Sequence, residues 1–440
     1  MVREMKHTEI GEIPAEWELQ TFEETFRILS NNTLPRAEMN NRGGIVRNVH
    51  YGDILTRFGE VLNCEKDEIP YLNDVSPLTA SAQVLQDGDV ILADTAEDDT
   101  VGKATEVYGL GKGRMVAGLH TIPCRVKKGD FVPKWLGYYM NSPLYHDQVL
   151  PYVTGIKVSS ISKTAISETL IAVPPIEEQK AIASALSEVD QLLVELKKVV
   201  SKLRDFKRGC LYLMFPQEGA DIPQMREPGY TEPWEQRKLE KTLYSLQNNT
   251  LSKAELSTEY GVARNVHYGD ILVKFREILD LRVETLPMIT DEDIVSKYRA
   301  SFLQEGDIVV ADTAEDETVG KCSEIIGLSG ETVVAGLHTI PYRPLFYFAP
   351  GYLGYYMNSP AYHQQLLPLM QGIKVTSISK FAMQNTIIAY PKSEDEQAKI
   401  GAYFCNLDHL ITLHQQKFDK YAQIKKAMMS ELITGKIKLV

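Results

Sequence analysis

The sequence repeats itself at an interval of about half its length. The string RNVHYGDIL occurs at Arg47–Leu55 and again, unchanged, at Arg264–Leu272. Further strings recur in the same order in both halves, namely ADTAED, TVGK, VAGLHTIP, YYMNSP, GIKV and SISK. The offset is 217 or 218 residues throughout, so only single-residue insertions separate the copies. The chain is therefore an internal duplication, and its fold must contain one unit twice.

The first part of each copy has the pattern of a β domain. Gly88–Thr95 and Gly306–Thr313 are short runs rich in Val, Ile and Ala that open on a Gly-Asp turn. Short helical connections, such as Lys134–Tyr139, are expected between strands of this kind. Each copy is therefore expected to begin with a twisted, mostly-β domain.

The last part of each copy has the pattern of a long helix. Apolar residues in Ile182–Leu203 recur in alternating steps of four and three, which is the a/d seam of a heptad repeat. Ile400–Tyr421 repeats this frame, with the polar His414 in the seam. Lys207 and Lys425 fall on the seam at matching places, where we expect the pattern to stutter. Two heptad helices in one chain favour pairing with each other.

Helix starts and a linker complete the expected architecture. Pro174–Glu178 and Pro391–Glu396 place proline before acidic residues, which is typical of a helix N-terminus. The fold class that follows is α+β: two duplicated, mostly-β domains with helices, separated by two long helices that form an antiparallel coiled coil, related by a pseudo-two-fold axis. The expected segments are a first domain at 1–176, a helix at 177–214, a Pro/Gly-rich linker at 215–231, a second domain at 232–391 and a second helix at 392–435.

The composition narrows the class of protein. A chain of 440 residues with 44% hydrophobic and 24% charged residues is expected to form two or three globular domains. It contains no run of 18 apolar residues, so no membrane span is expected, and its polar N-terminus does not read as a secretory signal. The five cysteines are scattered and none forms a C-x-x-C pair, which indicates reduced thiols in the cytoplasm and no structural zinc site.

Several motifs resemble those of one family, the specificity subunits of type I restriction–modification enzymes. Each half has a Trp-Glu pair near its start, at Trp17–Glu18 and Trp234–Glu235. Each has a G…IS loop, at Gly155–Ser162 and Gly372–Ser379. A proline-acid-Glu-Gln helix start follows at Pro174–Gln179. The resemblance covers essentially the whole chain, because the same motifs occur twice in the same order.

The second half departs from this pattern at one place. Tyr390–Ser393 replaces the double proline at the start of the second helix, although Glu396 and Gln397 are kept. In the first helix, Ile182, Leu186 and Asp190 match the helical spacing that the family tends to have. The departure leaves only the first turn of the second helix in doubt.

The resemblance implies a function in which this chain reads DNA for partner enzymes. It implies two target-recognition domains on two helical spacers, and binding to double-stranded DNA at a bipartite site. It also implies assembly with two DNA adenine methyltransferase subunits, which use S-adenosylmethionine, and with two restriction and translocase subunits, which use ATP and Mg²⁺. No cofactor is expected on this chain, and no membrane.

The sequence lacks the motifs that those reactions need. Base methylation uses an Asn/Asp-Pro-Pro-aromatic motif, whereas the only Pro-Pro here lies in Val173–Ile176. ATP-driven translocation uses G-x-x-x-x-G-K-[ST], and Gly109–Gly113 does not have that spacing. We therefore expect a non-catalytic subunit and assign no catalytic residue.

Candidate DNA contacts occur in pairs, one in each copy. Arg and Asn are the residue types that read guanine and adenine, and here they stand beside His and Tyr. A lysine in each Gly-Ile-Lys-Val loop, next to serine, suits a phosphate contact, and a lysine after Val-Gly forms a weaker third pair. The predicted DNA-binding residues are Arg47, Asn48, His50, Tyr51, Lys103, Lys157 and Ser160, with Arg264, Asn265, His267, Tyr268, Lys321, Lys374 and Ser377 in the second copy. The alternative is a structural role, in which the Arg-Asn pairs lie on a strand edge and their side chains only cap the fold.

The duplication also predicts the form of the DNA target. Two readers that share long identical strings should recognise partly similar half-sites in inverted orientation, which makes the target an interrupted near-palindrome. The copies differ at 35–43 against 252–260 and at 57–85 against 274–304, so any asymmetry should be encoded there. The centres of the half-sites should lie about one helical turn apart, roughly 34–36 Å.

Other interpretations remain open at this point. The net charge of −12 counts against a protein that coats DNA nonspecifically, and it slightly favours a protein-binding scaffold with coiled-coil helices. The paired histidines, such as His120 and His338, can suggest a metal site, but no acidic or cysteine partner stands at ligand spacing, so none is predicted. The acid-rich Asp94–Asp98 is better explained as a turn that closes a strand than as a Mg²⁺ or nuclease site.

Overall fold

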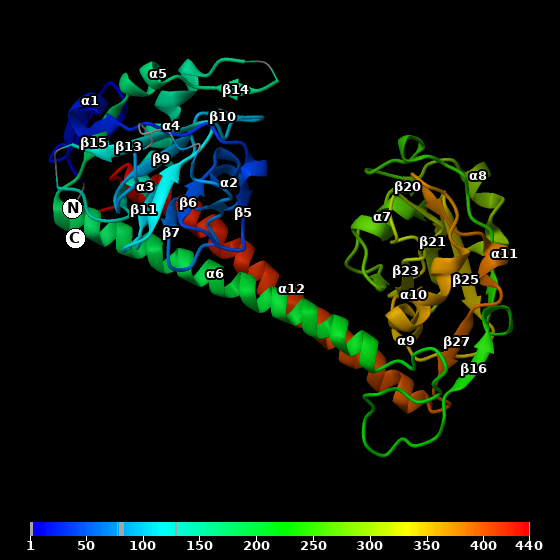
Figure 1. Cartoon of the computed structure of the whole chain (residues 1–440). Coiled ribbons are helices and arrows are strands. Elements are labelled where there is room, and N and C mark those ends of the chain that lie inside the picture. The colour runs from blue at the N-terminus through cyan, green and yellow to red at the C-terminus, as the bar shows by residue number, and fades with distance from the viewer. Residues whose placement is uncertain (1–2, 77, 79–82, 128–129, 156, 440) are drawn as a thin grey trace. The chain divides into compact units, whose positions relative to one another are not determined.

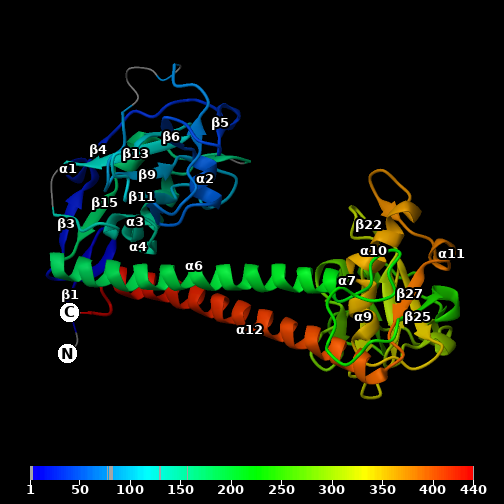
Figure 2. The ribbon, with the colours of Figure 1, turned by 60° about the horizontal axis from the view of Figure 1, so that its bottom comes forward.

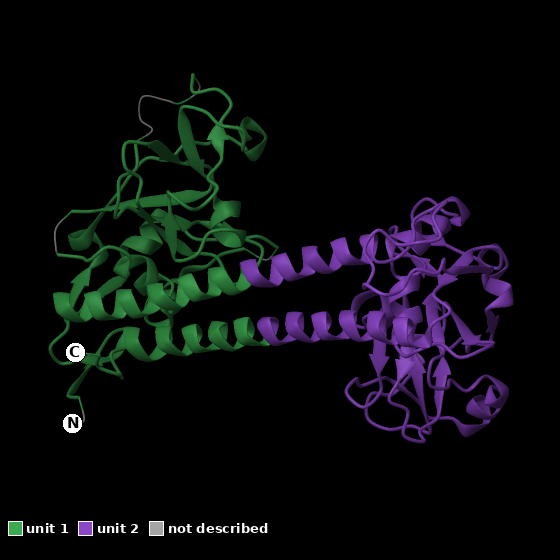
Figure 3. Cartoon of the chain, turned by 90° about the horizontal axis from the view of Figure 1, so that it is seen from below, with its two compact units in different colours: residues 1–197, 416–440 green, residues 198–415 purple. Residues whose placement is uncertain are grey.

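The computed structural model in Figure 1 describes residues 3–76, 78, 83–127, 130–155 and 157–439. The chain divides into two compact units, shown in two colours in Figure 3. Unit 1 comprises residues 1–197 and 416–440, and unit 2 comprises residues 198–415. Each unit thus contains one copy of the duplicated sequence together with the end of the other copy's helix.

Unit 1 is built on two sheets. The larger has the order β4-β13-β9-β11-β7, antiparallel except for the parallel pair β11–β7. The smaller has the order β12-β6-β8-β5. The strand bounds are β4 Phe26–Ile28, β5 Met39–Asn40, β6 Val46–Val49, β7 Val61–Asn63, β8 Tyr71–Leu72, β9 Val90–Ala93, β11 Ala104–Tyr108, β12 Arg114–Ala117 and β13 Thr121–Val126. Short pairs complete it: β1 Met5–Thr8 with β2 Gly11–Pro14, β3 Glu18–Thr21 with β15 Leu170–Val173, and β10 Thr95–Ala96 with β14 Ser159–Ser160.

Unit 2 repeats this plan, apart from the β1–β2 pair and the short edge strand β5, which have no counterpart among its described strands. Its larger sheet has the order β17-β25-β21-β23-β19 and its smaller sheet β20-β18-β24. The bounds are β17 Leu243–Ser245, β18 Ala263–Val266, β19 Ile278–Asp280, β20 Met288–Ile289, β21 Ile308–Ala311, β23 Cys322–Ile326, β24 Val333–Ala335 and β25 Thr339–Pro344. Short pairs are β16 Glu235–Lys238 with β27 Ile387–Tyr390 and β22 Thr313–Ala314 with β26 Thr376–Ser377. The expected duplication of a mostly-β domain is confirmed.

Short helices connect the strands, and all except α1 and α8 occur at equivalent places in the two units. In unit 1 they are α1 Phe22–Thr25, α2 Tyr51–Thr56, α3 Trp135–Met140, α4 Pro143–Val149 and α5 Lys163–Ser167. In unit 2 they are α7 Tyr268–Val273, α8 Glu292–Ser296, α9 Tyr352–Met357, α10 Pro360–Leu366 and α11 Lys380–Met383. Aromatic side chains of α3 and α9 are fully buried in the main core of each unit.

The two heptad segments form the long helices α6, Ile176–Leu213, and α12, Glu394–Ile433. In unit 1 the start of α6, with Ile182, shares a core with the end of α12, with Leu432. In unit 2 the end of α6, with Leu211, shares a core with the start of α12, with Phe404. Within each unit the helix segments therefore run antiparallel and side by side, as expected (Figure 2). Among the described residues, no helix is apolar over a length that would span a membrane.

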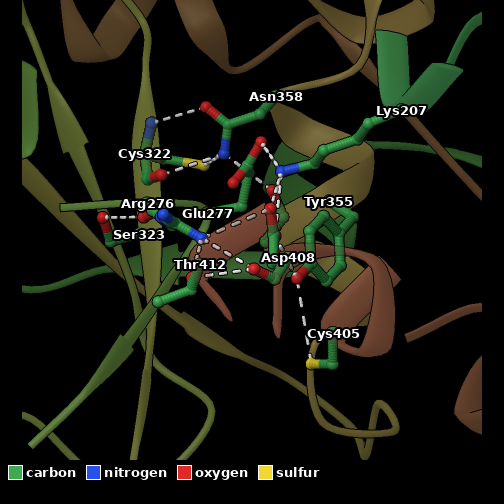
Figure 4. A network of polar contacts seen from close by, with 11 residues as sticks. Lys207, Arg276, Glu277, Cys322, Ser323, Tyr355, Asn358, Cys405, Asp408 and Thr412 are labelled. Carbon is green, nitrogen blue, oxygen red and sulfur yellow. Dashed lines mark hydrogen bonds and ion pairs between the residues drawn. The ribbon is translucent and has the colours of Figure 1, made fainter. Parts of the chain in front are cut away.

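The seam lysines of these helices are bound by acidic residues. Both helices run without a break through Lys207 and Lys425. In unit 2, Lys207 Nζ lies 2.8 Å from the carboxylates of Asp408 in α12 and Glu277 beside the sheet, as Figure 4 shows. In unit 1, Lys425 pairs with Asp190 at 2.6 Å and with Glu60. A lysine is accommodated on an otherwise apolar seam because two carboxylates compensate its charge.

The motifs that carry the family resemblance also join each β domain to its helix. Trp17 Nε1 donates to Glu178 at 2.9 Å, and Trp234 Nε1 donates to Glu396 at 3.3 Å. An arginine completes each group: Arg3 donates to both oxygens of Glu178, at 2.6 and 2.7 Å, and the second unit repeats this bidentate pair with another arginine. The Trp and the helix-start Glu of the motifs are therefore structural residues, which hold the domain on the first turns of its helix.

Candidate nucleic-acid interface

Polar and aromatic side chains gather around His120 in unit 1. Its Nδ1 lies 3.2 Å from Asp94 Oδ1 and 3.2 Å from Thr95 Oγ1, both at the end of β9. The Tyr51 ring meets the His120 ring edge-on at 5.2 Å between centroids, and His50 lies 4.6 Å from Tyr51 on the other side. Three stretches that are distant in the sequence thus meet at one place.

Unit 2 contains the same cluster. His338 Nδ1 lies 3.4 Å from Asp312 Oδ1 and 3.3 Å from Thr313 Oγ1. Tyr268 meets the His338 ring at 5.1 Å, and His267 lies 4.7 Å from Tyr268. Because both copies keep this geometry, we treat the two clusters, each centred on one histidine, as the candidate functional sites.

The central histidines adopt an unusual backbone conformation. His120 has φ of 55° and His338 has φ of 54°, and they and Lys134 are the only non-glycine residues with positive φ in the described part of the chain. This left-handed region is uncommon for residues with a side chain, although histidine tolerates it better than most. Strain of this kind often marks functional sites, where the surrounding structure holds a side chain in a required direction.

The orientation of these rings leaves one nitrogen for an outside partner. Asp94 and Thr95 occupy Nδ1 of His120, so an external ligand is directed to Nε2. The side chains of His120 and His338 are 46% and 47% exposed, which makes them accessible from solvent. A histidine held in this way can accept a hydrogen bond at Nε2 when neutral and donate one when protonated.

A hairpin that we call the finger begins beside each cluster. In unit 1 Thr95 pairs with Ser160, and in unit 2 Thr313 pairs with Ser377. The finger of unit 2 is residues 371–377, closed by reciprocal backbone hydrogen bonds of 2.9 and 2.8 Å between Gln371 and Ser377. The finger of unit 1 is residues 154–160, of which residue 156 lies outside the described residues. β14 marks the finger of unit 1 in Figure 1, and Figure 2 labels β22, the strand that pairs with the finger of unit 2.

The predicted loop lysines lie at the tips of these fingers. Lys157 and Lys374 are both exposed, as a phosphate contact requires. Ser160 is half-buried and Ser377 is exposed, each on the strand that returns from the tip. The fingers and the histidine clusters therefore bring together the predicted Lys, Ser and Tyr positions of each copy.

The predicted Arg-Asn pairs lie partly inside the fold. Arg47 Nη1 donates to the Cys64 carbonyl at 2.8 Å, and the Arg264 guanidinium makes the same bond to Leu281, so each guanidinium is half-buried. The side chains of the two asparagines are fully buried: Asn32 donates to Asn48 Oδ1 at 2.6 Å, and the second copy repeats this bond at Asn265. This burial argues against the predicted base contact by Asn48 and Asn265, because each amide lies inside the fold and its Oδ1 accepts a hydrogen bond there, although the buried Asn265 Nδ2 has no partner.

Two further predicted pairs also have structural roles. His50 Nδ1 accepts the Gly52 N–H at 3.2 Å and caps α2, and His267 caps α7 in the same way. Burial lowers the pKa of both histidines, which favours their neutral form. Lys103 and Lys321 donate to the carbonyls of Leu55 and Leu272, at 3.0 and 2.9 Å, and burial lowers their pKa as well.

Sequence reasoning did not select the residues at the centre of the clusters. The sequence favoured hydrogen bonds within the fold or a position facing DNA over a metal site for the paired histidines, and a turn over a Mg²⁺ site for Asp94, but none of these residues was selected as a DNA contact. Their recurrence inside VAGLHTIP and ADTAED was visible, but the sequence gives no sign of the left-handed backbone or of the contact between those two strings. Within the described residues, no three His, Cys, Asp or Glu side chains form a group that would hold a metal ion.

Comparison with known proteins finds that the chain is similar to members of one family. Residues 14–202 match the family model of the type I restriction modification DNA specificity domain. The chain is 24% identical to a Methanocaldococcus jannaschii protein named as the MjaX type I restriction enzyme specificity subunit, with 99% of this chain and 96% of the relative aligned. It is 26% identical to the type I restriction enzyme MjaVIII specificity subunit of the same organism, over 65% of this chain and 66% of the relative.

Solved structures share the fold. A chain from a structure that describes assembly and conformational transition of the type I R-M system aligns with a TM-score of 0.59 and 17% identity, covering 97% of this chain and 99% of that one. The type I restriction–modification S subunit from M. genitalium aligns with a TM-score of 0.50 and 12% identity, covering 98% and 99%. The expected resemblance is confirmed: the chain carries a type I restriction–modification DNA specificity domain and is related, over nearly its whole length, to the specificity subunits of these enzymes.

Proposed function

We propose that this chain recognises a bipartite DNA target and directs partner subunits to it, without catalysing a reaction itself. The observation that carries the proposal is the duplicated cluster: each unit has an accessible, oriented histidine, a neighbouring tyrosine and a finger that ends in an exposed lysine. The exposed groups suit DNA, because lysine contacts phosphates and histidine and tyrosine contact base edges or sugars. The family relationship supports the same function.

The proposed target has two similar ends. Because both units have the same cluster and finger, we expect two partly alike half-sites in inverted orientation, separated by bases that are not read. Their centres should lie about one helical turn apart, roughly 34–36 Å, so that both are read from one side of the duplex. Asymmetry between the half-sites should come from the stretches that differ between the copies, 57–85 and 274–304.

The proposed partners supply the chemistry. Two methyltransferase subunits would bind S-adenosylmethionine and methylate adenine N6, and two restriction and translocase subunits would use ATP and Mg²⁺. The complex would work in the cytoplasm, where its DNA is, and this chain would hold no cofactor. Exposed apolar residues seven positions apart on α6, at Val199 and Phe206, lie outside the seam that joins α6 to α12 and suit contact with a partner subunit.

Methylation mapping tests this function. The chain is expressed with a candidate adenine methyltransferase subunit from the same genome in a host without other adenine methylation, and N6-methyladenine is mapped over the host genome. We expect one interrupted near-palindrome to be methylated at both ends, and no methylation when this chain is omitted. Two unrelated half-sites would reject the near-palindrome, while methylation that does not depend on this chain, or a complex that binds no DNA, would reject the function in favour of a protein scaffold.

A further inference from the structure

The tip of the finger of unit 2 carries apolar side chains that are exposed to solvent. Ile373 is completely exposed and Val375 is 53% exposed, and Lys374 stands between them. In unit 1, Val158 at the equivalent of Val375 is 51% exposed, next to Lys157. Isolated exposed apolar residues are ordinary, but two flanking one lysine at the end of a narrow hairpin, with the same sequence in both copies, form a specific surface.

Backbone hydrogen bonds and a required glycine hold the tip of the finger in one conformation. The bonds between Gln371 and Ser377 close it at the base of the tip. Gly372 has φ of 115°, and a Cβ atom there would lie 2.0 Å from the Val375 carbonyl oxygen, so only glycine permits this tight tip. Gly155 in unit 1 has the same close approach, 2.0 Å to the Val158 oxygen.

The root of the finger is also fixed. Ile378, next to the closing pair, is buried in the main core of unit 2, and its N–H donates to the Asp312 carbonyl at 2.8 Å. Asp312 also contacts His338, so the finger and the histidine cluster share a support. A ligand contacted by His338 is therefore within reach of a finger whose tip carries a cation between two apolar groups.

We propose that the finger of unit 2 inserts its apolar tip between adjacent base pairs of the target and partly unstacks them, while Lys374 contacts a neighbouring phosphate. This proposal rests on the DNA-reading function. Apolar side chains inserted between base steps are a general means of unstacking and kinking DNA. Pyrimidine–purine steps unstack most easily, so Ile373 and Val375 would add a preference for such a step without a hydrogen bond to it.

Fluorescence of 2-aminopurine tests the wedge, because this base brightens when it is unstacked. The full chain in complex with its methyltransferase subunit is bound to target duplexes that carry 2-aminopurine at each position of a half-site in turn. We expect a several-fold rise at one step of the half-site that unit 2 reads. The double variant I373A/V375A, which keeps Lys374, should abolish this rise, whereas L345A, at a leucine of unit 2 that is 53% exposed like Val375, should change nothing.

The outcomes separate the wedge from the function on which it rests. A complex that binds and methylates its target with no brightening at any position overturns the wedge alone, and a complex that binds no target overturns both. If I373A/V375A weakens assembly with the methyltransferase in the absence of DNA, the tip is a protein contact and the wedge is wrong. Urea unfolding of I373A/V375A checks that the variant is folded, and K374A should keep the brightening while binding more weakly.

Discussion

Lys207 in α6 places its Nζ 2.8 Å from each carboxylate oxygen of Asp408 in α12 (Figure 4). Glu277, at the end of the sheet, accepts from the same Nζ at 2.8 Å, so one lysine joins both helices to the β domain. Tyr355 adds a hydrogen bond of 2.8 Å to Asp408. Since all of these side chains are largely buried, the lysine determines which residues of the two helices face each other.

Replacing this lysine should destabilise unit 2 strongly. In Lys207→Met, Asp408 and Glu277 lose their buried cation, and Arg276, whose Nη1 lies 3.7 Å from Asp408 Oδ1, is the nearby cation that Asp408 keeps. Removal of one partner from a buried ion pair costs about 3–5 kcal/mol. Urea unfolding measures the loss. Lys202→Met, at an exposed lysine of the same helix, should change stability by less than about 0.5 kcal/mol.

A triple variant separates charge from packing. Lys207→Met combined with Glu277→Gln and Asp408→Leu removes the buried charges together, and such replacements are often neutral or stabilising. We expect most of the lost stability to return. If the triple variant is as unstable as Lys207→Met alone, packing of the lysine stem, and not its charge, accounts for the loss.

Buried glutamates should make stability depend on pH. Burial raises the pKa of Glu324 from 4.5 to about 7, although Gly351 and Gly354 donate backbone N–H groups to its carboxylate. The folded chain then binds more protons than the unfolded chain between about pH 4.5 and 7, so the free energy of unfolding falls as pH rises through this window. Glu106 in unit 1 has the same raised value, about 7, with the same cause.

Glu324→Gln tests this assignment. The variant cannot ionise at this position, so its stability relative to the natural chain should rise between about pH 4.5 and 7 and level off above that, measured as the midpoint of urea unfolding. The general effect of the negative net charge acts equally on Glu315→Gln, an exposed glutamate of the same unit, whose curve should run parallel to that of the natural chain. Parallel curves for Glu324→Gln as well would show that Glu324 is ionised throughout this range.

Much of the fold could be predicted because its signals are periodic or repeated. The heptad seam that begins at Ile182 predicted the pairing of the two long helices, and the repeated strings predicted two equivalent β domains. The ion pair between Arg3 and Glu178 was not predictable in this way. Its counterpart Arg226 lies 223 residues further on, outside the common offset, and only the structure shows that both arginines reach a helix start.

The candidate site was harder to predict, because burial is decided by tertiary packing. Asn48 and Lys374 are both polar residues in repeated strings, yet Asn48 is fully buried and Lys374 is exposed at the tip of a hairpin. Nothing in the local sequence distinguishes a polar residue that forms hydrogen bonds in the protein interior from one that faces a ligand. The choice of His120 needed its φ angle and its contact with Asp94, which are both properties of the folded chain.

The two kinds of predicted lysine should respond differently to mutation. Lys374→Ala should weaken DNA binding by the methyltransferase complex and reduce the slope of log K against log salt by about 0.9, because one phosphate contact is lost. Lys321→Ala should leave that slope unchanged and lower the urea midpoint, because Lys321 binds the Leu272 carbonyl. Titrations of fluorescent target DNA at several salt concentrations measure the slope. An equal slope for Lys374→Ala and the natural chain would remove this residue from the interface.

The central histidines should prove important for binding and not for folding. His338→Asn keeps a residue type that tolerates the left-handed backbone but shortens the side chain, so it should fold normally and bind target DNA more weakly, by about 1–3 kcal/mol if a base contact is lost. His338→Val should instead destabilise unit 2 by about 1–2 kcal/mol, because a β-branched residue is strained at φ of 54°.

A glycine at position 338 separates the effect of backbone strain from the effect of a lost DNA contact. If the strain at His338 serves only the fold, His338→Gly, which removes it, should raise the unfolding midpoint and leave DNA binding intact. If the strain aims the ring at DNA, as we expect, His338→Gly should be as stable as the natural chain or more so, and it should bind as weakly as His338→Asn.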